Sequence, residues 1–137
     1  MISIAALREG DELPPLELRP GLGQVIRFCA LNWNFPEAFY DPEAARAQGM
    51  PGTIVPGPLK LGLIYTAIER WLDDGGWIRQ VRAAHRRPDL TARPIVITGR
   101  VARVYEEHGR SRADLEIVVI NEKGEPSVRG FAVVESR

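Results

Sequence analysis

Apolar residues recur at three- and four-residue steps in two stretches of the chain, and this spacing predicts two helices. The stronger pattern covers Pro58–Leu72, with Gly75 and Gly76 placed to stop the helix, and the weaker pattern covers Gly21–Leu31. A glycine inside a helix costs about 1 kcal/mol against alanine, so Gly62 suggests that another backbone approaches closely there. The apolar face of the longer helix consists of Leu61, Ile64, Tyr65, Ile68, Trp71 and Leu72.

After the longer helix the apolar period shortens to two residues, which is the period of β-strands. An earlier strand, bounded by prolines, precedes the helices. The connections between the later strands contain glycine, which suits the positive φ of hairpin turns. The expected strands are Pro14–Arg19, Trp77–Ala84, Ile95–Ala102, Leu115–Ile120 and Val128–Val134, with turns at Glu107–Arg110 and Asn121–Glu125. One long amphipathic helix before a run of antiparallel strands predicts an α+β fold, in which the helix packs on one curved sheet.

An irregular segment with its own local signals lies between the two predicted helices. Asn34 follows the first helix in a loop that breaks it. Asp41 is a suitable N-cap, and Pro42 fits the first position of a new helix. This short helix, Glu43–Gln48, is expected to end at Gly49, after which a glycine-rich turn leads into the long helix.

The segment Asn34–Leu59 resembles the active-site segment of the MaoC-like (R)-specific enoyl-CoA hydratases and dehydratases. Its sequence is N-F-P-E-A-F-Y-D-P-E-A-A-R-A-Q-G-M-P-G-T-I-V-P-G-P-L. The patterns D-P-E-x-A-x-x-x-G-x-P-G and P-G-P-L match in order and spacing, and the opening G-D-E-L-P-P-L-E-L-R-P resembles the first strand of that family. The resemblance covers most of the chain and implies a hot-dog fold, in which a curved antiparallel sheet wraps one long central helix. The length of 137 residues indicates a single domain, 1–137.

The resemblance also implies where catalytic groups would stand. In that family the loop carries an aspartate and, five residues later, a histidine, and a His-Gly pair leads into the long helix. The resembling positions here hold Asn34, Phe39, Pro56 and Gly57. An amide has no titratable proton near neutral pH, and phenylalanine has no polar side-chain atom. Losing either group costs on the order of 100- to 10,000-fold in rate, so ordinary hydratase activity is not expected.

Part of the binding chemistry is expected to survive at this site. The backbone N–H of Gly57, at the start of the long helix, is suited to a thioester carbonyl, with help from the helix dipole. Phe39 and Pro56, where the family has histidines, would make the pocket drier and bulkier. Such a pocket is either filled or binds a bulky apolar acyl group without hydrating it.

Other side chains near the loop are candidates for replacing the missing chemistry or for binding the ligand. Glu37 is a possible substitute base if the loop rearranges, and a solvated carboxylate is the alternative. Tyr40 either packs or contributes to the substrate-binding wall. Arg86 and Arg87, together with Arg82, either bind the phosphates of CoA, for which arginine is well suited, or form an ordinary solvated strand face.

The remaining reactive side chains indicate structure rather than chemistry. His85, at a strand end, is interpreted as a surface or structural histidine, and a place facing the ligand tunnel is the alternative. His108 lies in a predicted turn and is expected to be solvated. Cys29 lies on an apolar helix face and is expected in the core. The two histidines do not have metal-ligand spacing and no Cys/His cluster is present, so neither a metal nor a resident cofactor is expected.

Composition narrows the choice of partner and compartment. The chain has 18 basic and 18 acidic residues, and this zero formal charge argues against nucleic-acid binding. Cys29 is the only cysteine, so no intrachain disulfide forms and a reducing compartment fits. No apolar run approaches membrane-spanning length, and the N-terminus lacks a signal pattern. We therefore expect a cytoplasmic protein that does not bind a membrane.

The leading hypothesis is a MaoC-like protein that binds an acyl-CoA or similar thioester, fatty or steroid-like, as a degenerate or partner subunit of an enoyl-CoA hydratase or dehydratase. One alternative is an active hydratase/dehydratase or thioesterase that uses a substitute residue such as Glu37. Another is a purely structural subunit with a closed pocket. Hot-dog units commonly pair by joining sheet edges, so the resemblance implies a homodimer or a hetero-oligomer with another hot-dog subunit.

Overall fold

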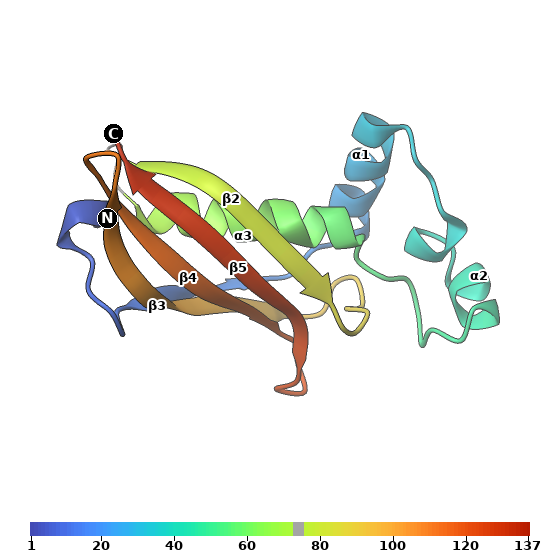
Figure 1. Cartoon of the computed structure of the whole chain (residues 1–137). Helices are drawn as coiled ribbons and strands as arrows, with labels where there is room; N and C mark the ends of the chain where they lie inside the picture. The colour runs from blue at the N-terminus through green and yellow to red at the C-terminus, as the bar shows by residue number, and fades with distance from the viewer. Residues whose placement is uncertain (73–75) are drawn as a thin grey trace.

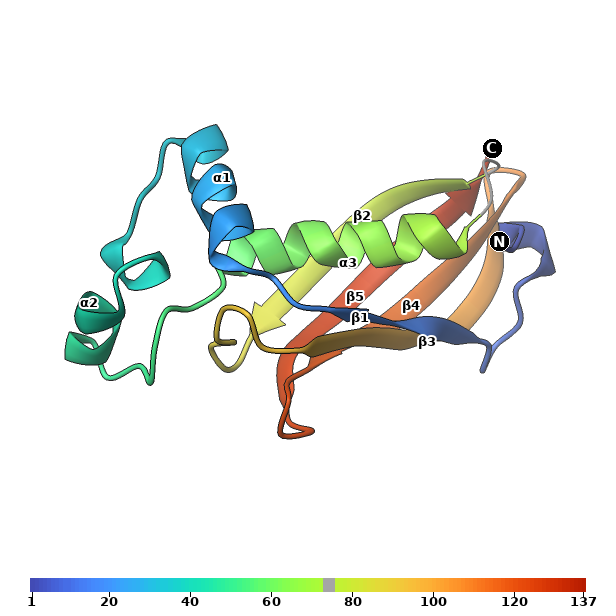
Figure 2. The same cartoon turned by 180° about the vertical axis from the view of Figure 1, so that it is seen from behind.

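A five-stranded antiparallel sheet wraps one side of a long central helix (Figures 1 and 2). The computed structural model describes residues 1–72 and 76–137. The strands follow the spatial order β1-β3-β4-β5-β2. Their bounds are Glu12–Leu18 for β1, Gly76–His85 for β2, Ile95–Glu107 for β3, Arg110–Ile120 for β4 and Pro126–Ser136 for β5. The α+β hot-dog arrangement predicted from the sequence is confirmed.

The long helix α3, Gly57–Trp71, packs its apolar face against the concave side of the sheet. Ile64 and Ile68 are fully buried in a core shared with the sheet. Burying an isoleucine side chain contributes roughly 1.5–3 kcal/mol relative to leaving it exposed. The helix lies within one residue of the predicted Pro58–Leu72. Gly76 begins β2, and Gly75, which was expected to help stop the helix, lies outside the described residues.

The expectation that Gly62 marks a close backbone approach is wrong. Gly62 is exposed, and a Cβ built on it would meet nothing within 4 Å. The close approach occurs at Gly99 in β3, where a Cβ would collide with the carbonyl oxygen of Glu116 and with the side chain of Ile117. Helical spacing alone therefore located the helix but not the point of tight packing.

Residues 21–56 form a protruding segment, here called the overhang, beyond one end of the sheet (Figure 1, right). It contains α1, Leu22–Asn32, a 3₁₀ turn at Glu37–Phe39, and α2, Pro42–Ala47. The predicted cap is confirmed, because the Asp41 carboxylate accepts hydrogen bonds from the backbone N–H of Glu43 at 2.9 Å and of Ala44 at 3.4 Å. A second 3₁₀ turn, Ile4–Ala6, lies near the N-terminus at the opposite end of the molecule.

The hairpin turns form where glycine was expected to permit them. His108 and Gly109 have φ values of 51° and 74° in the turn from β3 to β4, and Gly124 has φ of 77° in the turn from β4 to β5. Both β3 and β4 extend further toward the first turn than predicted. The added residues pair across the strands, with Tyr105 opposite Arg112. Many of these added residues are charged, so this part of the strands lacks the apolar alternation on which the prediction relied.

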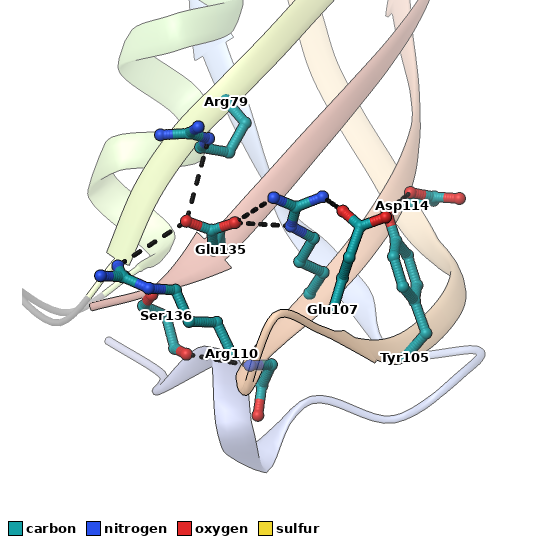
Figure 3. A network of polar contacts seen from close by, with 9 residues as sticks. Arg79, Tyr105, Glu107, Arg110, Asp114, Glu135 and Ser136 are labelled. Atoms are coloured by element: carbon teal, nitrogen blue, oxygen red, sulfur yellow. Dashed lines mark hydrogen bonds and ion pairs between the residues drawn. The ribbon is translucent and has the colours of Figure 1, made fainter.

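An ion-pair network joins β2, β4 and β5 close to the C-terminus (Figure 3). The Glu135 carboxylate, 5% exposed, accepts a hydrogen bond from Arg112 Nε at 2.5 Å. Arg110 and Arg79 approach the same carboxylate at 3.7 Å and 3.9 Å, and Arg112 also pairs with Glu107. The hydrogen bond from Arg112 lowers the pKa of Glu135 below its usual range, aided by the charges of the three arginines and opposed by burial.

Candidate functional site

The candidate site lies where the overhang meets the start of α3. Pro56 is the N-cap of this helix, Gly57 is its first residue, and Pro58 follows. Proline has no backbone N–H, so Gly57 and Leu59 carry the amide donors of the first three helical positions. Among the described residues, no acceptor takes a hydrogen bond from the Gly57 N–H. The start of α3 therefore presents a backbone donor and the positive end of the helix dipole.

A cavity of about 120 Å³ adjoins this helix start. Three of the predicted site residues, Asn34, Phe39 and Pro56, meet around it although they come from three different parts of the overhang. Gly57 lies between two residues of the cavity wall. The complete lining is Phe28, Cys29, Asn32, Asn34, Phe39, Pro56 and Pro58.

Local backbone structure explains how Asn34 and Phe39 reach this cavity. Trp33 ends α1 in the left-handed conformation, and the Asn34 N–H donates to the Cys29 carbonyl at 3.0 Å, which turns the chain back along the helix. Phe39 closes the 3₁₀ turn, and its N–H donates to the Pro36 carbonyl at 3.0 Å. The Phe39 ring is partly buried against the core.

The cavity wall offers little acid/base chemistry. Cys29 is buried, as expected from the sequence, and burial raises the pKa of its thiol above the ordinary value. The side chain of Asn32 is occupied, because its Nδ2 donates to the Phe28 carbonyl at 2.9 Å. The Asn34 amide has no hydrogen-bond partner within residues 1–72 and 76–137, so it is available to a ligand or water. An amide orients such a group but does not take its proton.

The structure does not bring Glu37 or Tyr40 into the cavity wall. Glu37 is exposed, and its carbonyl accepts hydrogen bonds from the next turn of chain. The Tyr40 hydroxyl donates to the Phe35 carbonyl at 3.4 Å and therefore packs along the overhang. Both residues belong to the same loop as Asn34 but present their side chains elsewhere.

The three arginines considered as phosphate ligands make different contacts, although Arg86 and Arg87 both donate a backbone N–H to the Ser127 carbonyl. The Arg82 guanidinium stacks over the Phe131 ring, 5.3 Å from its centroid. Arg86 uses its backbone N–H on the Ser127 carbonyl at 2.8 Å. Arg87 donates from Nη1 to the Pro126 carbonyl at 3.1 Å and lines a separate depression of about 210 Å³. Among the described residues, no arginine lines the cavity at the start of α3.

His85 is exposed, as expected from the sequence, whereas the buried ion pair near it was not predicted. His85 ends β2, and its ring packs on Gly57: a Cβ built there would lie 3.2 Å from His85 Nε2. Lys60, one turn into α3, forms an ion pair with Asp89, its Nζ 2.9 Å from Oδ2, with both side chains at most 3% exposed. Lysine on the apolar side of a predicted helix was the available signal, since a buried lysine needs a partner.

The charge state of His85 follows from these surroundings. Partial burial is the main influence that lowers the pKa of His85 below its ordinary value of 6.5. The positive charge of Lys60 acts in the same direction, and the negative charge of Asp89 acts against it. The imidazole is therefore neutral near pH 7, with one ring N–H as donor and the other nitrogen as acceptor.

The described residues contain neither a metal-binding cluster nor a membrane-spanning helix. Within 1–72 and 76–137, no group of three or more His, Cys, Asp or Glu side chains is arranged to hold a metal ion. In the same part of the chain, no helix has the length and apolarity needed to cross a bilayer.

Similarity to solved structures identifies the fold of this chain. No family model matches the sequence, and no curated protein matches it. The (R)-hydratase from A. caviae involved in PHA biosynthesis aligns over 96% of this chain and 98% of its own, with a TM-score of 0.86 and 22% identity. The MaoC-like dehydratase from Rhodospirillum rubrum aligns over 99% and 97%, with a TM-score of 0.86 and 16% identity.

A third similar structure is one chain of a two-subunit complex. The ChsH1-ChsH2 complex from Mycobacterium tuberculosis aligns over 95% of this chain and 98% of the matched chain, with a TM-score of 0.83 and 19% identity. Near-complete coverage in both directions means that the sheet, the central helix and the overhang all have counterparts. The chain has the hot-dog fold in the form shared by MaoC-like hydratases and dehydratases.

Proposed function

We propose that the protein binds an acyl-CoA or similar thioester at the start of α3 and serves as a degenerate or partner subunit of an enoyl-CoA hydratase or dehydratase. The observation that carries this proposal is the meeting of Asn34, Phe39 and Pro56 around one cavity beside Gly57. The sequence resemblance places the catalytic groups of the family at Asn34 and Phe39, and a further histidine at Pro56. The proposed site therefore lies where the family has its active site, but Asn34 and Phe39 stand in place of the proton-transfer groups.

The chemistry of hydration explains why these changes matter. As water adds to the β-carbon of an enoyl thioester, a base takes a proton from the water and an acid protonates the α-carbon. Donors must meanwhile stabilise the negative charge on the thioester oxygen. Gly57 and the helix dipole fit the last role. Asn34 and Phe39 are unsuited to the first two, so we expect binding with little or no hydration.

The size of the cavity favours a second subunit in the complete site. A volume of about 120 Å³ is well below the roughly 300–1,000 Å³ of ordinary ligand pockets. This chain therefore accounts for the thioester end of the ligand, and another hot-dog subunit would complete the acyl wall. The ChsH1-ChsH2 complex is, by its name, an assembly of two subunits, and one of its chains shares this fold, which supports such an arrangement here.

The two edges of the sheet differ in their suitability for a partner. Edge strand β1 contains Pro14 and Pro15, which remove backbone donors and discourage pairing. Edge strand β2 is ten residues long, lacks proline, and leaves Trp77 50% exposed. An edge with these properties is a ready template for another strand, so β2 is the edge at which we expect the partner subunit to join.

A purely structural subunit is the second candidate, and the small cavity volume favours it. Calorimetric titration with crotonyl-CoA and longer enoyl-CoAs, against free CoA as reference, separates the two candidates. The proposal predicts saturable binding that requires the acyl thioester and weakens in Asn34→Leu. The matched control Glu37→Gln should leave binding unchanged, because Glu37 lies outside the cavity wall.

Two outcomes of this titration, and one of a parallel activity assay, would speak against the proposal. Heats that match free CoA would support the structural subunit. Binding that Asn34→Leu leaves unaltered would place the ligand elsewhere on the protein. Hydration by the purified chain that disappears in Glu37→Gln would show an active enzyme with Glu37 as its base.

A further inference from the structure

The contact between His85 and Gly57 is the most specific feature of the candidate site that the proposed function leaves unused. Nε2, Cδ2 and Cε1 of the imidazole all lie within 3.3 Å of the position that a Cβ on Gly57 would occupy. Contacts of 3.0–3.4 Å are tighter than nine in ten real Cβ contacts, so a side chain at position 57 would require the ring to shift by a few tenths of an ångström. The ring thus lies against Gly57, the first residue of α3.

The imidazole has hydrogen-bonding capacity to spare. Among residues 1–72 and 76–137, no side-chain hydrogen bond or ion pair engages His85, and the rest of its surface is exposed. The ring approaches the helix start from β2, whereas Asn34 and Phe39 approach from the overhang. An acceptor bound to the Gly57 N–H would be bordered by the ring on one side.

Charged groups on α3 and on the segment after β2 lie near this imidazole. Lys60 lies on α3, Asp89 lies in the segment after β2, and Arg86 and Arg87 follow His85 directly in the chain. Lys60 and Asp89 form an ion pair, which keeps both charges fixed near the ring. A neutral imidazole with one N–H suits an uncharged carbonyl acceptor better than an anion, which the arginines would serve.

We propose that His85 is a binding residue for the thioester carbonyl, and that its ring N–H and the Gly57 N–H together hold the carbonyl oxygen. This inference rests on the proposed function and names the side chain through which the site polarises its ligand. Two converging donors draw electron density toward the oxygen. The same arrangement selects thioesters over ligands that lack a carbonyl at this position.

The test uses cinnamoyl-CoA, an aryl enoyl thioester whose absorbance moves to longer wavelength when its carbonyl accepts hydrogen bonds. The wild-type protein should bind this ligand and produce the shift. His85→Phe keeps an aromatic ring against Gly57 but removes the donor. It should abolish most of the shift and raise Kd by roughly 2- to 12-fold, as expected for the loss of one hydrogen bond.

Two further variants separate a donor role from a structural one. His85→Gln restores an N–H donor and should recover part of the shift. His108→Asn is the matched control, because His108 lies in the remote β3–β4 turn at φ 51°, a conformation that asparagine tolerates. It should behave as the wild type. Circular dichroism of every variant establishes that the fold is kept.

The pH profile gives a readout that packing alone would not produce. Protonation of His85 below its lowered pKa adds a positive charge and a second donor. The wavelength shift should therefore grow as the pH falls below the ordinary imidazole pKa of 6.5 in the wild type and in His108→Asn, and should stay flat in His85→Phe.

The outcomes distinguish this inference from the proposed function on which it rests. An unchanged shift and an unchanged Kd in His85→Phe, with the wild type binding normally, would overturn the role of His85 alone. A wild-type protein that binds neither cinnamoyl-CoA nor crotonyl-CoA would overturn the proposed function and this inference together. Binding with a shift that depends on the residue-85 donor supports both.

Discussion

Lys60 and Asp89 form a nearly solvent-free ion pair, with Nζ 2.9 Å from Oδ2, that ties the first turns of α3 to the segment following β2. Lys60 Nζ also donates to the Arg87 carbonyl at 3.2 Å. Asp89 Oδ1, in contrast, is buried without a hydrogen-bond partner in the described part of the chain. The pair holds together the two segments that contribute Gly57 and His85, so it positions the site without touching a ligand.

Removing one member of this pair should destabilise the fold strongly. Lys60→Met leaves a buried carboxylate without its counterion, and a loss of about 3–5 kcal/mol in the free energy of unfolding is expected. The double variant Lys60→Met/Asp89→Leu removes both charges and should recover most of this loss. Urea denaturation of the single and double variants measures both effects.

The exposed pair Arg100–Glu116 is a suitable control for that experiment. Its Nε–Oε2 distance of 2.8 Å is equally short, but its side chains are 66% and 55% exposed. Arg100→Ala should therefore cost less than about 1 kcal/mol. Equal effects of Lys60→Met and Arg100→Ala would show that burial of the Lys60–Asp89 pair is energetically unimportant.

Replacing Gly62 or Gly99 by alanine should change the free energy of unfolding in opposite directions. Gly62→Ala places a methyl group in open space on a helix and should raise the free energy of unfolding by about 0.5–1 kcal/mol. Gly99→Ala drives a methyl group into the β4 backbone and should lower it by about 1–3 kcal/mol. Thermal unfolding of both variants tests this, and stabilisation by Gly99→Ala would contradict the observed strand packing.

Restoring the missing proton-transfer groups should create hydratase activity. In Asn34→Asp/Phe39→His a carboxylate and an imidazole would share the cavity beside Gly57. Hydration of enoyl-CoA should rise on the order of 100-fold or more over the wild type, because each group contributes general acid or base catalysis. The measurement is the loss of enoyl-thioester absorbance, in the presence of a partner subunit if one is found.

The single variants are the controls for this gain. Asn34→Asp and Phe39→His alone should each give a small fraction of the rate of the double variant, since the carboxylate and the imidazole act on the same water. A folded double variant that binds enoyl-CoA but shows no gain would mean that the cavity geometry, and not only the residue types, differs from that of a hydratase.

The acid stability of the fold should depend on Glu135. Its pKa is lowered in the folded state, chiefly by the hydrogen bond from Arg112, so the folded protein releases this proton more readily than the unfolded chain. The stabilisation is present above the ordinary pKa of 4.5 and is lost as pH falls toward the lower folded value. Glu135→Gln should reduce stability at pH 7 and flatten the acid decline of Tm, and an unaltered decline would contradict this role.

Local signals in the sequence predicted much of the scaffold. The Asp41 cap, the glycine-containing turns and the extent of α3 each depend on residues close together in the chain, and each formed where expected. The buried face of α3 was predicted only in part, because Tyr65 is 37% exposed whereas Leu63 and Ala67 are buried. Strand lengths were underestimated because the outer faces of β3 and β4 carry charged residues such as Arg103 and Arg112, whose pairing across strands is not visible as alternation.

Contacts between distant segments were the part that the sequence did not reveal. His85 and Gly57 are in contact because the end of β2 passes over the start of α3. No local sequence pattern near either residue predicts that contact. Lys60 and Asp89 pair for the same reason. In contrast, Asn34, Phe39 and Pro56 were placed near one another through resemblance to a known motif, and the structure brings all three to one cavity.

The most direct test of the central claim is the enoyl-thioester absorbance of crotonyl-CoA and longer enoyl-CoAs after mixing with excess purified protein. Binding without hydration predicts that the absorbance band is perturbed on mixing and then stays constant. A band that decays faster than in buffer would show that the protein hydrates its ligand despite Asn34 and Phe39. A band that is unperturbed for every thioester would show that the start of α3 does not bind thioesters at all.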